Sequence, residues 1–303
     1  MTTPSRAVLG QVPVAFLGGM SIAALGMQET VDRMAEAVRL HARPGTPLYF
    51  TSANGEVMSR HARDAEFAGL VDMADLISAD GQPMVTVSRF VGDRALPVRV
   101  ATTDLYHEVA RKAAAEGLTF YLYGATEDEN RAAVATTRRL YPALRIVGHH
   151  HGYLAGDALT DKIAEIDALA PDILWIALGV PREQAFVRDH GPLLRNVALI
   201  KTSGGLFNFL SGSRSRAPAW VQRVGFEWLW RLVQEPRRLF WRYCLTNPHS
   251  LYLMLTRSGD RRRARQGEGK TGEGKTGEGK TGEAMALTEL EDSDLVGRRA
   301  KGA

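Results

Sequence analysis

Polar residues that can carry out acid–base chemistry follow two of the apolar, strand-like runs in the sequence. "FTSANGE" places Ser52, Asn54 and Glu56 at the end of the first run, and "ISADGQP" places Asp80 and Gln82 at the end of the next. An aspartate held at a strand terminus by a following glycine has the fixed position that a general base requires. An aspartate there also suits a turn or a helix cap, and spacing alone favours that second role.

Three further motifs could contribute to a site at the strand ends. "ATTDL" offers Thr103 and Asp104, for which a helix N-cap role fits at least as well. "ALGVPREQ" (177–184) contains a glycine and a proline, so we expect a helix to begin near Arg182 and to turn its free N–H groups towards an anion. "TSGGLFNF" (202–209) has paired glycines, which allow the backbone to approach a ligand closely.

The elements that must position these residues alternate along the chain. Apolar runs of strand length, each bounded by Gly, Pro, Asn or Asp, occur at 47–52, 74–80, 118–124, 144–149, 172–179 and 197–204. Helical segments such as 130–141 and 161–169 lie between them, and Thr126 with Glu129 forms a capping box that marks a helix start after Gly124. This pattern predicts a Rossmann-like α/β fold, a parallel sheet flanked by helices, with ligands beyond the carboxyl ends of the strands.

The character of the chain changes after Phe209. Residues 213–256 carry four of the five tryptophans and seven arginines, and Pro236 and Pro248 are expected to divide this region into short helices. From about Ser258 the chain is polar and aperiodic, which predicts disorder. We therefore expect three parts: a catalytic domain at 1–212, a helical Arg/Trp-rich appendage at 213–257 and a low-complexity tail at 258–303.

Two glycine-rich patterns in the tail imitate nucleotide-binding motifs. Residues 269–276 match the phosphate loop G-x-x-x-x-G-K-[ST], and residues 267–272 match G-x-G-x-x-G. A phosphate loop works because a strand leads in and a helix leads out, so that N–H groups converge on phosphate. The tandem GEGKT repeat has neither flank, and the "DSD" at 292–294 lies in the same stretch. We assign no function to these patterns.

The composition limits the class of protein. The chain has 303 residues, of which 45% are apolar, enough for one large α/β domain or two small ones. The best candidate for a membrane span, 12–27, contains three glycines and falls short of the roughly 20 apolar residues needed. We expect no export signal, and the single cysteine, Cys244, suits the cytoplasm. The net charge is only +4, but arginines gather at 214–265, which indicates an anionic partner: phosphate, nucleic acid or a membrane surface.

The sequence offers little for a metal ion. His149, His150 and His151 are adjacent and cannot all point at one metal, so a polar cluster at a strand end is the preferred interpretation. The predicted sheet region has no D-x-D motif and no spaced Cys/His set. Arginines would therefore have to neutralise any phosphate charge.

Several motifs together resemble a known family. "TSANGE", "ADGQP", "TTDL", "GVPREQ" and above all "FNFLSGSRSRAPAWVQRVGFEWLWRLVQEPRRLFWRY" are similar to motifs of the bacterial WecG/TagA/CpsF glycosyltransferases, and they occur in the family's order. The resemblance runs from about Val12 to Tyr243. It implies an inverting, metal-independent enzyme that needs no cofactor. Such an enzyme moves a sugar, usually N-acetylmannosamine or, in exopolysaccharide relatives, glucose, from a UDP-sugar to a polyprenyl-diphosphate-linked saccharide.

The resemblance also implies a location and a set of site residues. Relatives act as peripheral proteins at the inner face of the plasma membrane, and a homo-oligomer is compatible with the motifs. Asp80 matches the catalytic base, and Ser52 and Asn54 match positions of the first motif near the reacting centre. Arginines matching Arg231, Arg238 and Arg242 are proposed to close over the site and hold the diphosphate. The positions that we assign to the nucleotide sugar are Gln82, Thr103, Asp104, Gly124, Gly179, Pro181, Glu183, Gln184, Gly204, Gly205 and Asn208.

The sequence departs from the family pattern at three places. "GVPREQ" reverses the usual glutamine–glutamate order, Thr102 stands where glycine is common, and Asn208 replaces the usual aspartate. Many members also have threonine in place of Ser52. The first and third departures border the expected nucleotide site, so they bear on the identity of the donor more than on the class of reaction.

Two other classes of protein fit parts of the sequence. A nucleotide-dependent oxidoreductase would use the same sheet, but a glycine-rich fingerprint at the first strand–helix turn is missing. A nucleic-acid-binding protein would use the arginines of the carboxyl-terminal region, which however alternate with tryptophan and leucine at helical spacing. That spacing fits helices that settle at a lipid interface, and equally helices that pack against the rest of the protein.

Overall fold

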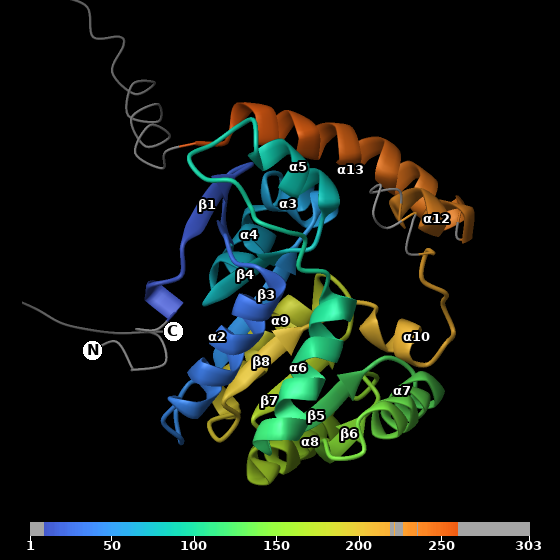
Figure 1. Cartoon of the computed structure of the whole chain (residues 1–303). Helices are drawn as coiled ribbons and strands as arrows, with labels where there is room; N and C mark the ends of the chain where they lie inside the picture. The colour runs from blue at the N-terminus through green and yellow to red at the C-terminus, as the bar shows by residue number, and fades with distance from the viewer. Residues whose placement is uncertain (1–8, 219–220, 222–226, 235, 260–303) are drawn as a thin grey trace, which may run out of the picture. The chain divides into compact units, whose positions relative to one another are not determined.

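The structure is a computed structural model that describes residues 9–218, 221, 227–234 and 236–259 (Figure 1). The chain divides into two units, residues 1–264 and 265–303, and every described residue belongs to the first. The GEGKT repeat, the "DSD" at 292–294 and the predicted tail beyond Gly259 lie outside the described residues. The predicted boundary between residues 212 and 213 stays a prediction.

A parallel sheet of six strands forms the centre of the fold. Its order is β4-β3-β8-β7-β5-β6, so the first and last strands of the sheet in the sequence, β3 and β8, are neighbours at its middle. Each predicted strand is present, which confirms the α/β fold class. The strands are β3 (Leu48–Ala53), β4 (Leu76–Ala79), β5 (Thr119–Gly124), β6 (Arg145–His150), β7 (Ile173–Ala177) and β8 (Leu199–Thr202).

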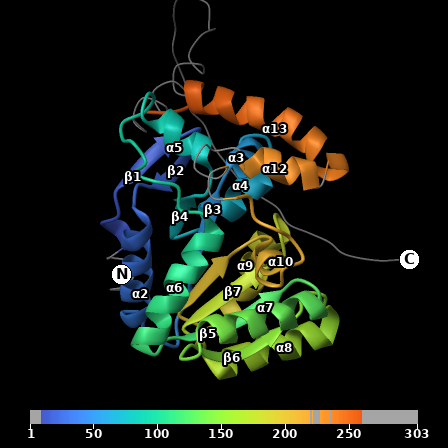
Figure 2. The ribbon, with the colours of Figure 1, turned by 45° about the vertical axis from the view of Figure 1, so that its right-hand side comes forward.

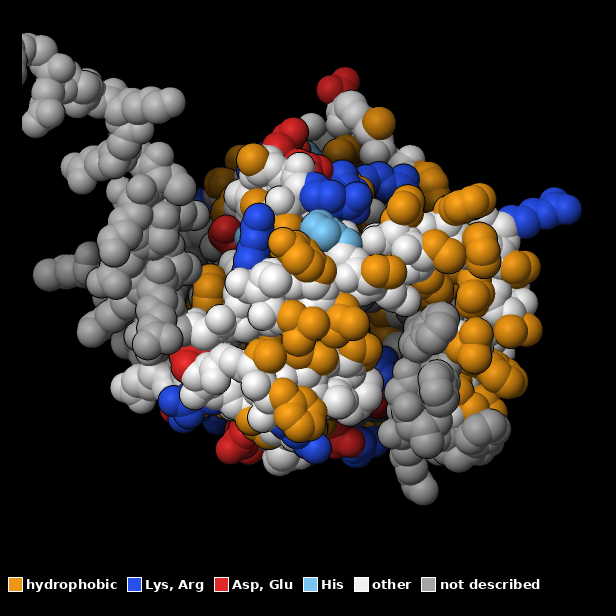
Figure 3. Space-filling model, turned by 90° about the horizontal axis from the view of Figure 1, so that it is seen from above, with side chains coloured by type: hydrophobic (Ala, Val, Ile, Leu, Met, Phe, Trp, Pro, Cys, Tyr) orange, Lys and Arg blue, Asp and Glu red, His pale blue; other side chains and the backbone are white. Residues whose placement is uncertain are grey.

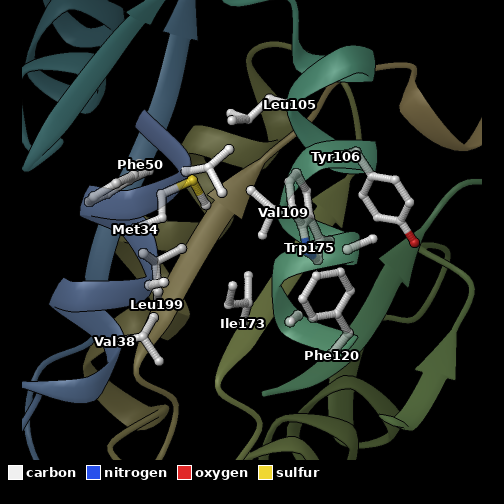
Figure 4. Close-up of a cluster of buried hydrophobic side chains, with 14 of the residues drawn as sticks. Met34, Val38, Phe50, Leu105, Tyr106, Val109, Phe120, Ile173, Trp175 and Leu199 are labelled. Atoms are coloured by element: carbon white, nitrogen blue, oxygen red, sulfur yellow. The ribbon is translucent and has the colours of Figure 1, made fainter. Parts of the chain in front are cut away.

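Helices cover both faces of this sheet because both faces of its central strands are apolar. On one face, α2 (Met27–Arg39), α6 (Thr102–Glu116) and α7 (Glu127–Leu140) pack against Phe50, Phe120 and Trp175 (Figure 4). On the other face, α8 (Gly156–Leu169) and α9 (Arg182–His190) cover Tyr123 and Ile200. Full burial of each large side chain contributes about 1.5–3 kcal/mol, so this double cover is the main source of the fold's stability.

The helix starts follow the predicted signals in two cases and differ in a third. Thr126 and Glu129 form the expected capping box at the start of α7, and α9 begins at Arg182 as predicted. Helix α8 begins at Gly156, five residues before the expected start. Five of its first seven residues are glycine or polar, so the buried positions Ile163 and Ile166 that mark a helical period come late in the helix.

A second core lies beside the sheet and was not predicted. The antiparallel hairpin of β1 (Val14–Leu17) and β2 (Met20–Ala23) packs with α3 (Gly55–His61), α4 (Ala65–Asp72) and α5 (Gln82–Ser88). Gly18 and Gly19 have φ angles of +59° and +88°, which suit a two-residue hairpin turn. A Cβ atom on Gly18 would lie 2.3 Å from the sulfur of Met58, and the positive φ angle also favours glycine there.

The carboxyl-terminal region forms two described helices, α12 (Glu227–Gln234) and α13 (Pro236–Thr256). Figures 1 and 2 show α13 lying along α3 and α5. Pro236 starts α13 as expected, but the prediction that Pro248 ends a helix is wrong, because α13 continues through it. Pro248 and Cys244 are both exposed, so solvent can hydrate the carbonyl group that loses its partner, while Leu253 and Met254 anchor the helix in the second core. Across the described residues, no helix combines the length and apolar character that a membrane crossing demands.

Candidate active site

The carboxyl edge of the sheet brings together the residues that follow its strands. Asp80 follows β4, Asn54 follows the adjacent strand β3, and Gly204 and Gly179 follow β8 and β7. Because all these strands are parallel, their ends meet at one edge, where ligands bind in open α/β sheets. Gly124, at the end of β5, belongs to the same edge. Its missing side chain is a packing requirement, since a Cβ atom there would lie 2.4 Å from the carbonyl oxygen of Ala177.

Asp80 is held from two directions. The hydroxyl group of Thr102 donates to Oδ2 at 2.9 Å, and the N–H of the same residue points to Oδ2 at 3.3 Å. Nη2 of Arg99 lies 3.4 Å from Oδ1. The carboxylate therefore lies at the amino end of α6, where the helix dipole attracts negative charge. It remains partly accessible, with 22% of its side chain exposed.

Beneath Asp80 lies a buried lysine that the motifs did not reveal. Lys201 on β8 is fully buried, and its Nζ donates to the hydroxyl oxygen of Ser52 at 2.9 Å and to the carbonyl oxygen of Thr202 at 2.7 Å. The Ser52 hydroxyl in turn lies 3.1 Å from that of Thr102. Burial lowers the pKa of the Lys201 ammonium group to about 8, against electrostatic attraction from Glu183 and Asp80. The available signal was a lone charged residue inside an apolar strand, which must find partners in the interior.

Glu183, at the start of α9, is the acidic neighbour of this lysine. Its carboxylate accepts a hydrogen bond from the N–H of Gly204 at 2.8 Å. Burial raises the pKa of the Glu183 carboxyl to about 7, although Gly204 and Lys201 oppose the shift. Gln184 beside it is also buried, and its Oε1 has no hydrogen-bond partner among the described residues. The reversed glutamate–glutamine order therefore places a carboxylate near a buried cation.

Asn54 supports the edge by capping a helix. Its side-chain oxygen accepts hydrogen bonds from the N–H groups of Glu56 at 3.0 Å and Val57 at 3.1 Å, which starts α3. This cap is typically worth about 1 kcal/mol. Gly81 lies directly against it, since a Cβ atom on Gly81 would be 3.6 Å from Cα of Asn54. Asn54 is therefore fixed in position next to Asp80.

Helix α13 brings Arg242 to the same region. Its guanidinium group pairs with Glu56 at 2.9 Å, in the first turn of α3. A second contact, between His249 and Ser59 at 2.9 Å, ties the two helices together. A solvent-open pocket of about 430 Å³ lies at this junction, lined by Glu56, Arg60, Arg63, Asp64, Arg242, Leu245 and Thr246. Arg231 and Arg238 belong to α12 and α13, and their side chains lie outside the described part of the structure.

The remaining predicted residues include two that form side-chain pairs, Asp104 and Asn208, and four others. Asp104, in the first turn of α6 rather than at its N-cap, forms a bidentate pair with Arg216, with its Oδ1 2.5 Å from Nη1. Asn208 donates a hydrogen bond to Glu129 of the α7 capping box. An aspartate at position 208 would repel that carboxylate, which accounts for the amide. The other positions lie at helix starts or tight turns near the edge: Gln82, Thr103, Pro181 and Gly205.

The three histidines do not converge on one point. His149 bonds to Asn130, His150 to the carbonyl oxygen of His151, and the ring of His151 accepts from the N–H of Tyr153. Burial lowers the pKa of the His149 imidazole, which favours its neutral form. Within the described residues, no three His, Cys, Asp or Glu side chains are grouped so that they could hold a metal ion.

Known proteins are similar to this chain over most of its length. The family described as Glycosyl transferase WecG/TagA/CpsF matches residues 14–264. An N-acetylglucosaminyldiphosphoundecaprenol N-acetyl-β-D-mannosaminyltransferase of Bacillus subtilis is 30% identical over 198 residues, which cover 65% of this chain and 75% of that protein. The protein of the same name from Bacillus spizizenii is 30% identical over 201 residues, covering 66% and 76%. The chain therefore belongs to the WecG/TagA/CpsF family and is a glycosyltransferase.

Proposed function

We propose that the protein transfers a sugar of the N-acetylmannosamine or glucose type from a UDP-sugar to a polyprenyl-diphosphate-linked saccharide. The transfer inverts the anomeric centre, needs no metal ion, and serves the synthesis of a cell-surface polysaccharide or exopolysaccharide. The names of the two Bacillus relatives support the class of acceptor and sugar, since both describe transfer of N-acetylmannosamine to an undecaprenyl-diphosphate-linked sugar. The observation that carries the proposal is a partly exposed carboxylate, Asp80, held at the carboxyl edge of the sheet.

Asp80 acts as the general base in this proposal. Its carboxylate removes the proton from the acceptor hydroxyl group while the hydroxyl oxygen attacks the anomeric carbon. The bond from that carbon to the diphosphate breaks on the opposite face, and UDP leaves with the bonding electrons. Proton removal by a positioned base contributes ~10²–10⁴ to the rate. Ser52 and Asn54 hold the surroundings of this carboxylate in place.

Arginines stabilise the leaving diphosphate. Arg242 is available for this role, because its buried Nε has no hydrogen-bond partner within the described residues and its head group borders the pocket between α3 and α13. We assign the same role to Arg231 on α12 and to Arg238 on α13. Guanidinium groups bind phosphate oxygens in bidentate fashion, which stabilises the charge that develops as UDP departs. The glycines, amides and hydroxyls along the edge, from Gln82 to Asn208, contact the nucleotide and sugar.

Helices α12 and α13 bring the site to a lipid-linked acceptor at the inner face of the membrane. Hydrophobic side chains gather on the face where these helices lie (Figure 3). Trp241, Leu245, Tyr252 and Leu255 follow one side of α13, and Val233 on α12 is 74% exposed. Such a surface, with basic residues beside it, suits a monolayer of anionic lipid. Leu245→Asp should therefore weaken co-flotation with anionic vesicles, and Leu193→Asp, at a similarly exposed site outside these helices, should not.

One assay tests the reaction. The purified full-length protein is incubated with a panel of UDP-sugars and short-chain lipid-diphosphate acceptors, with EDTA present, and the product is identified by mass spectrometry and NMR. We expect one donor to be consumed, UDP to be released, and the new linkage to have the opposite anomeric configuration. Absence of transfer from every donor, or a product that retains the configuration, would contradict the proposal.

A further inference from the structure

Lys201 is an unusual residue for its place in the fold. It lies on β8 at the middle of the sheet, paired in register with Phe50 on β3 and Trp175 on β7, and it is fully buried. Removing an ammonium group from water is costly unless hydrogen bonds and opposite charge compensate for the loss. A strand that needed only to fill the core would carry an apolar residue here, as β8 does at Leu199 and Ile200.

The hydrogen bonds of Lys201 form a chain with a defined direction. Thr102 donates its hydroxyl proton to Oδ2 of Asp80, so its oxygen must accept from Ser52. The proton of Ser52 is then used, and its oxygen accepts from Nζ of Lys201. Each hydroxyl group has only one proton to donate, so every link points from the buried ammonium group to the carboxylate.

We propose that Lys201 is a positioning residue for sugar transfer, which orients the Asp80 carboxylate through Ser52 and Thr102; the inference rests on the function proposed above. These hydrogen bonds hold Oδ2 of Asp80 towards the interior. Among the described residues, Oδ1 has only the longer 3.4 Å contact with Arg99, and it is the oxygen that receives the acceptor proton. Loss of the ammonium group would let both hydroxyl groups reorient, and a base displaced by about 1 Å can lose ~10²-fold in rate.

A purely structural role for Lys201 makes a different prediction. The lysine is also attracted to Glu183, so it could merely balance a second buried charge. In that case its loss would lower the stability of the protein, and any effect on turnover would be independent of Thr102. A measurement of stability therefore does not separate the two roles. They are separated by whether the effects of changing Lys201 and Thr102 on kcat depend on each other.

The test is a double-mutant cycle of Lys201→Met and Thr102→Val, with kcat and donor KM measured on the full-length protein. We expect each single variant to lower kcat by ~10- to 100-fold with little change in donor KM. The double variant should be no slower than the slower single variant. If the fold-losses in kcat of the two single variants multiply in the double variant, the proposed role of Lys201 is wrong. A normal kcat in Lys201→Met would also overturn it.

Two further variants protect the result from misfolding. Lys201→Met combined with Glu183→Gln removes the carboxylate that would be left buried without its cation, and the cycle is repeated in that background. Thr137→Val removes another buried hydroxyl group, which bonds to Tyr106 away from the site, and should leave kcat unchanged. A wild-type protein that transfers no sugar would overturn the proposed function. An active wild-type protein with multiplying effects overturns only the role of Lys201.

Discussion

Asp80 and Arg242, the two charges assigned to opposite ends of the reaction, are held by different parts of the fold. Asp80 follows a strand of the sheet and is fixed by Thr102 on α6, with Arg99 beside it and a buried lysine below. Arg242 projects from α13, whose outer side is exposed, and its pair is with Glu56 on α3. The proposed base is thus attached to the central sheet, while the charge proposed to bind phosphate comes from a helix with an exposed side. The largest effects on chemistry should therefore come from the sheet side.

Replacement of the base should have the largest effect. Asp80→Asn keeps the size of the side chain but removes its ability to take a proton, so kcat should fall by ~10²–10⁴. UDP binding, measured by calorimetry, should be unchanged. Asp75→Asn is the matched control, because Asp75 precedes the same strand at its opposite end and should be dispensable for turnover. Near-normal kcat in Asp80→Asn would remove the proposed base.

Loss of Arg242 should have a smaller effect. Arg242→Ala removes one donor to the departing diphosphate, and such donors are typically worth ~10²–10³ in kcat where the site excludes water. Because 28% of the Arg242 side chain is exposed to solvent, and because Arg231 and Arg238 share its assigned role, we expect the lower end of that range. Arg257→Ala, an exposed arginine beyond the end of α13, serves as the control. Equal activity of both variants would dissociate Arg242 from the reaction.

The fold was predictable where burial is simple. Six strands could be recognised because each is an apolar run between turn residues, and Thr126 with Glu129 marked the start of α7. The β1–β2 hairpin was missed although its Gly-Gly turn is a hairpin signal. We predicted a helix end at Pro248, but α13 continues through it, because packing against α3 outweighs the local cost of the proline.

The candidate site was predictable at the level of motifs but not of contacts. Family resemblance singled out Asp80, Ser52 and Asn54, and the family is confirmed. Lys201 and Thr102 were missed as partners of the base, since their roles depend on strands and a helix that are distant in sequence. The reversed order at Glu183 was visible, but its neighbour across the edge, Lys201, could be known only once β8 was placed beside β3.

The Glu183 carboxyl should make stability depend on pH. Its pKa is about 7 in the folded protein and 4.5 ordinarily, so between these values the folded state binds more protons than the unfolded state. Stability of the wild-type protein should therefore fall as pH rises from 4.5 to 7, by at most about 3 kcal/mol relative to Glu183→Gln. Lys201 and Tyr49 are the titratable groups that face this carboxyl, and both residues are present in the wild-type protein and in Glu183→Gln. Urea unfolding of both proteins between pH 4.5 and 7 checks this prediction. If their free energies of unfolding change in parallel with pH, the prediction is wrong.

Deletion of the tail should have the smallest effect. A chain ending at Gly259 keeps α13 and both cores but loses the GEGKT repeat. We expect kcat/KM to match that of the full-length protein, because the sequence around the repeat predicts neither the strand nor the helix that a phosphate loop needs. A clear loss of activity would show that the tail takes part in binding or transfer.

The most direct test of the account is a crystal structure of the protein with UDP and an acceptor analogue. We expect the acceptor hydroxyl oxygen about 2.6–3.2 Å from Oδ1 of Asp80, with Arg242 directed at the diphosphate. An acceptor hydroxyl bound beyond the reach of Asp80, with another side chain in contact with it, would contradict the assignment of the base.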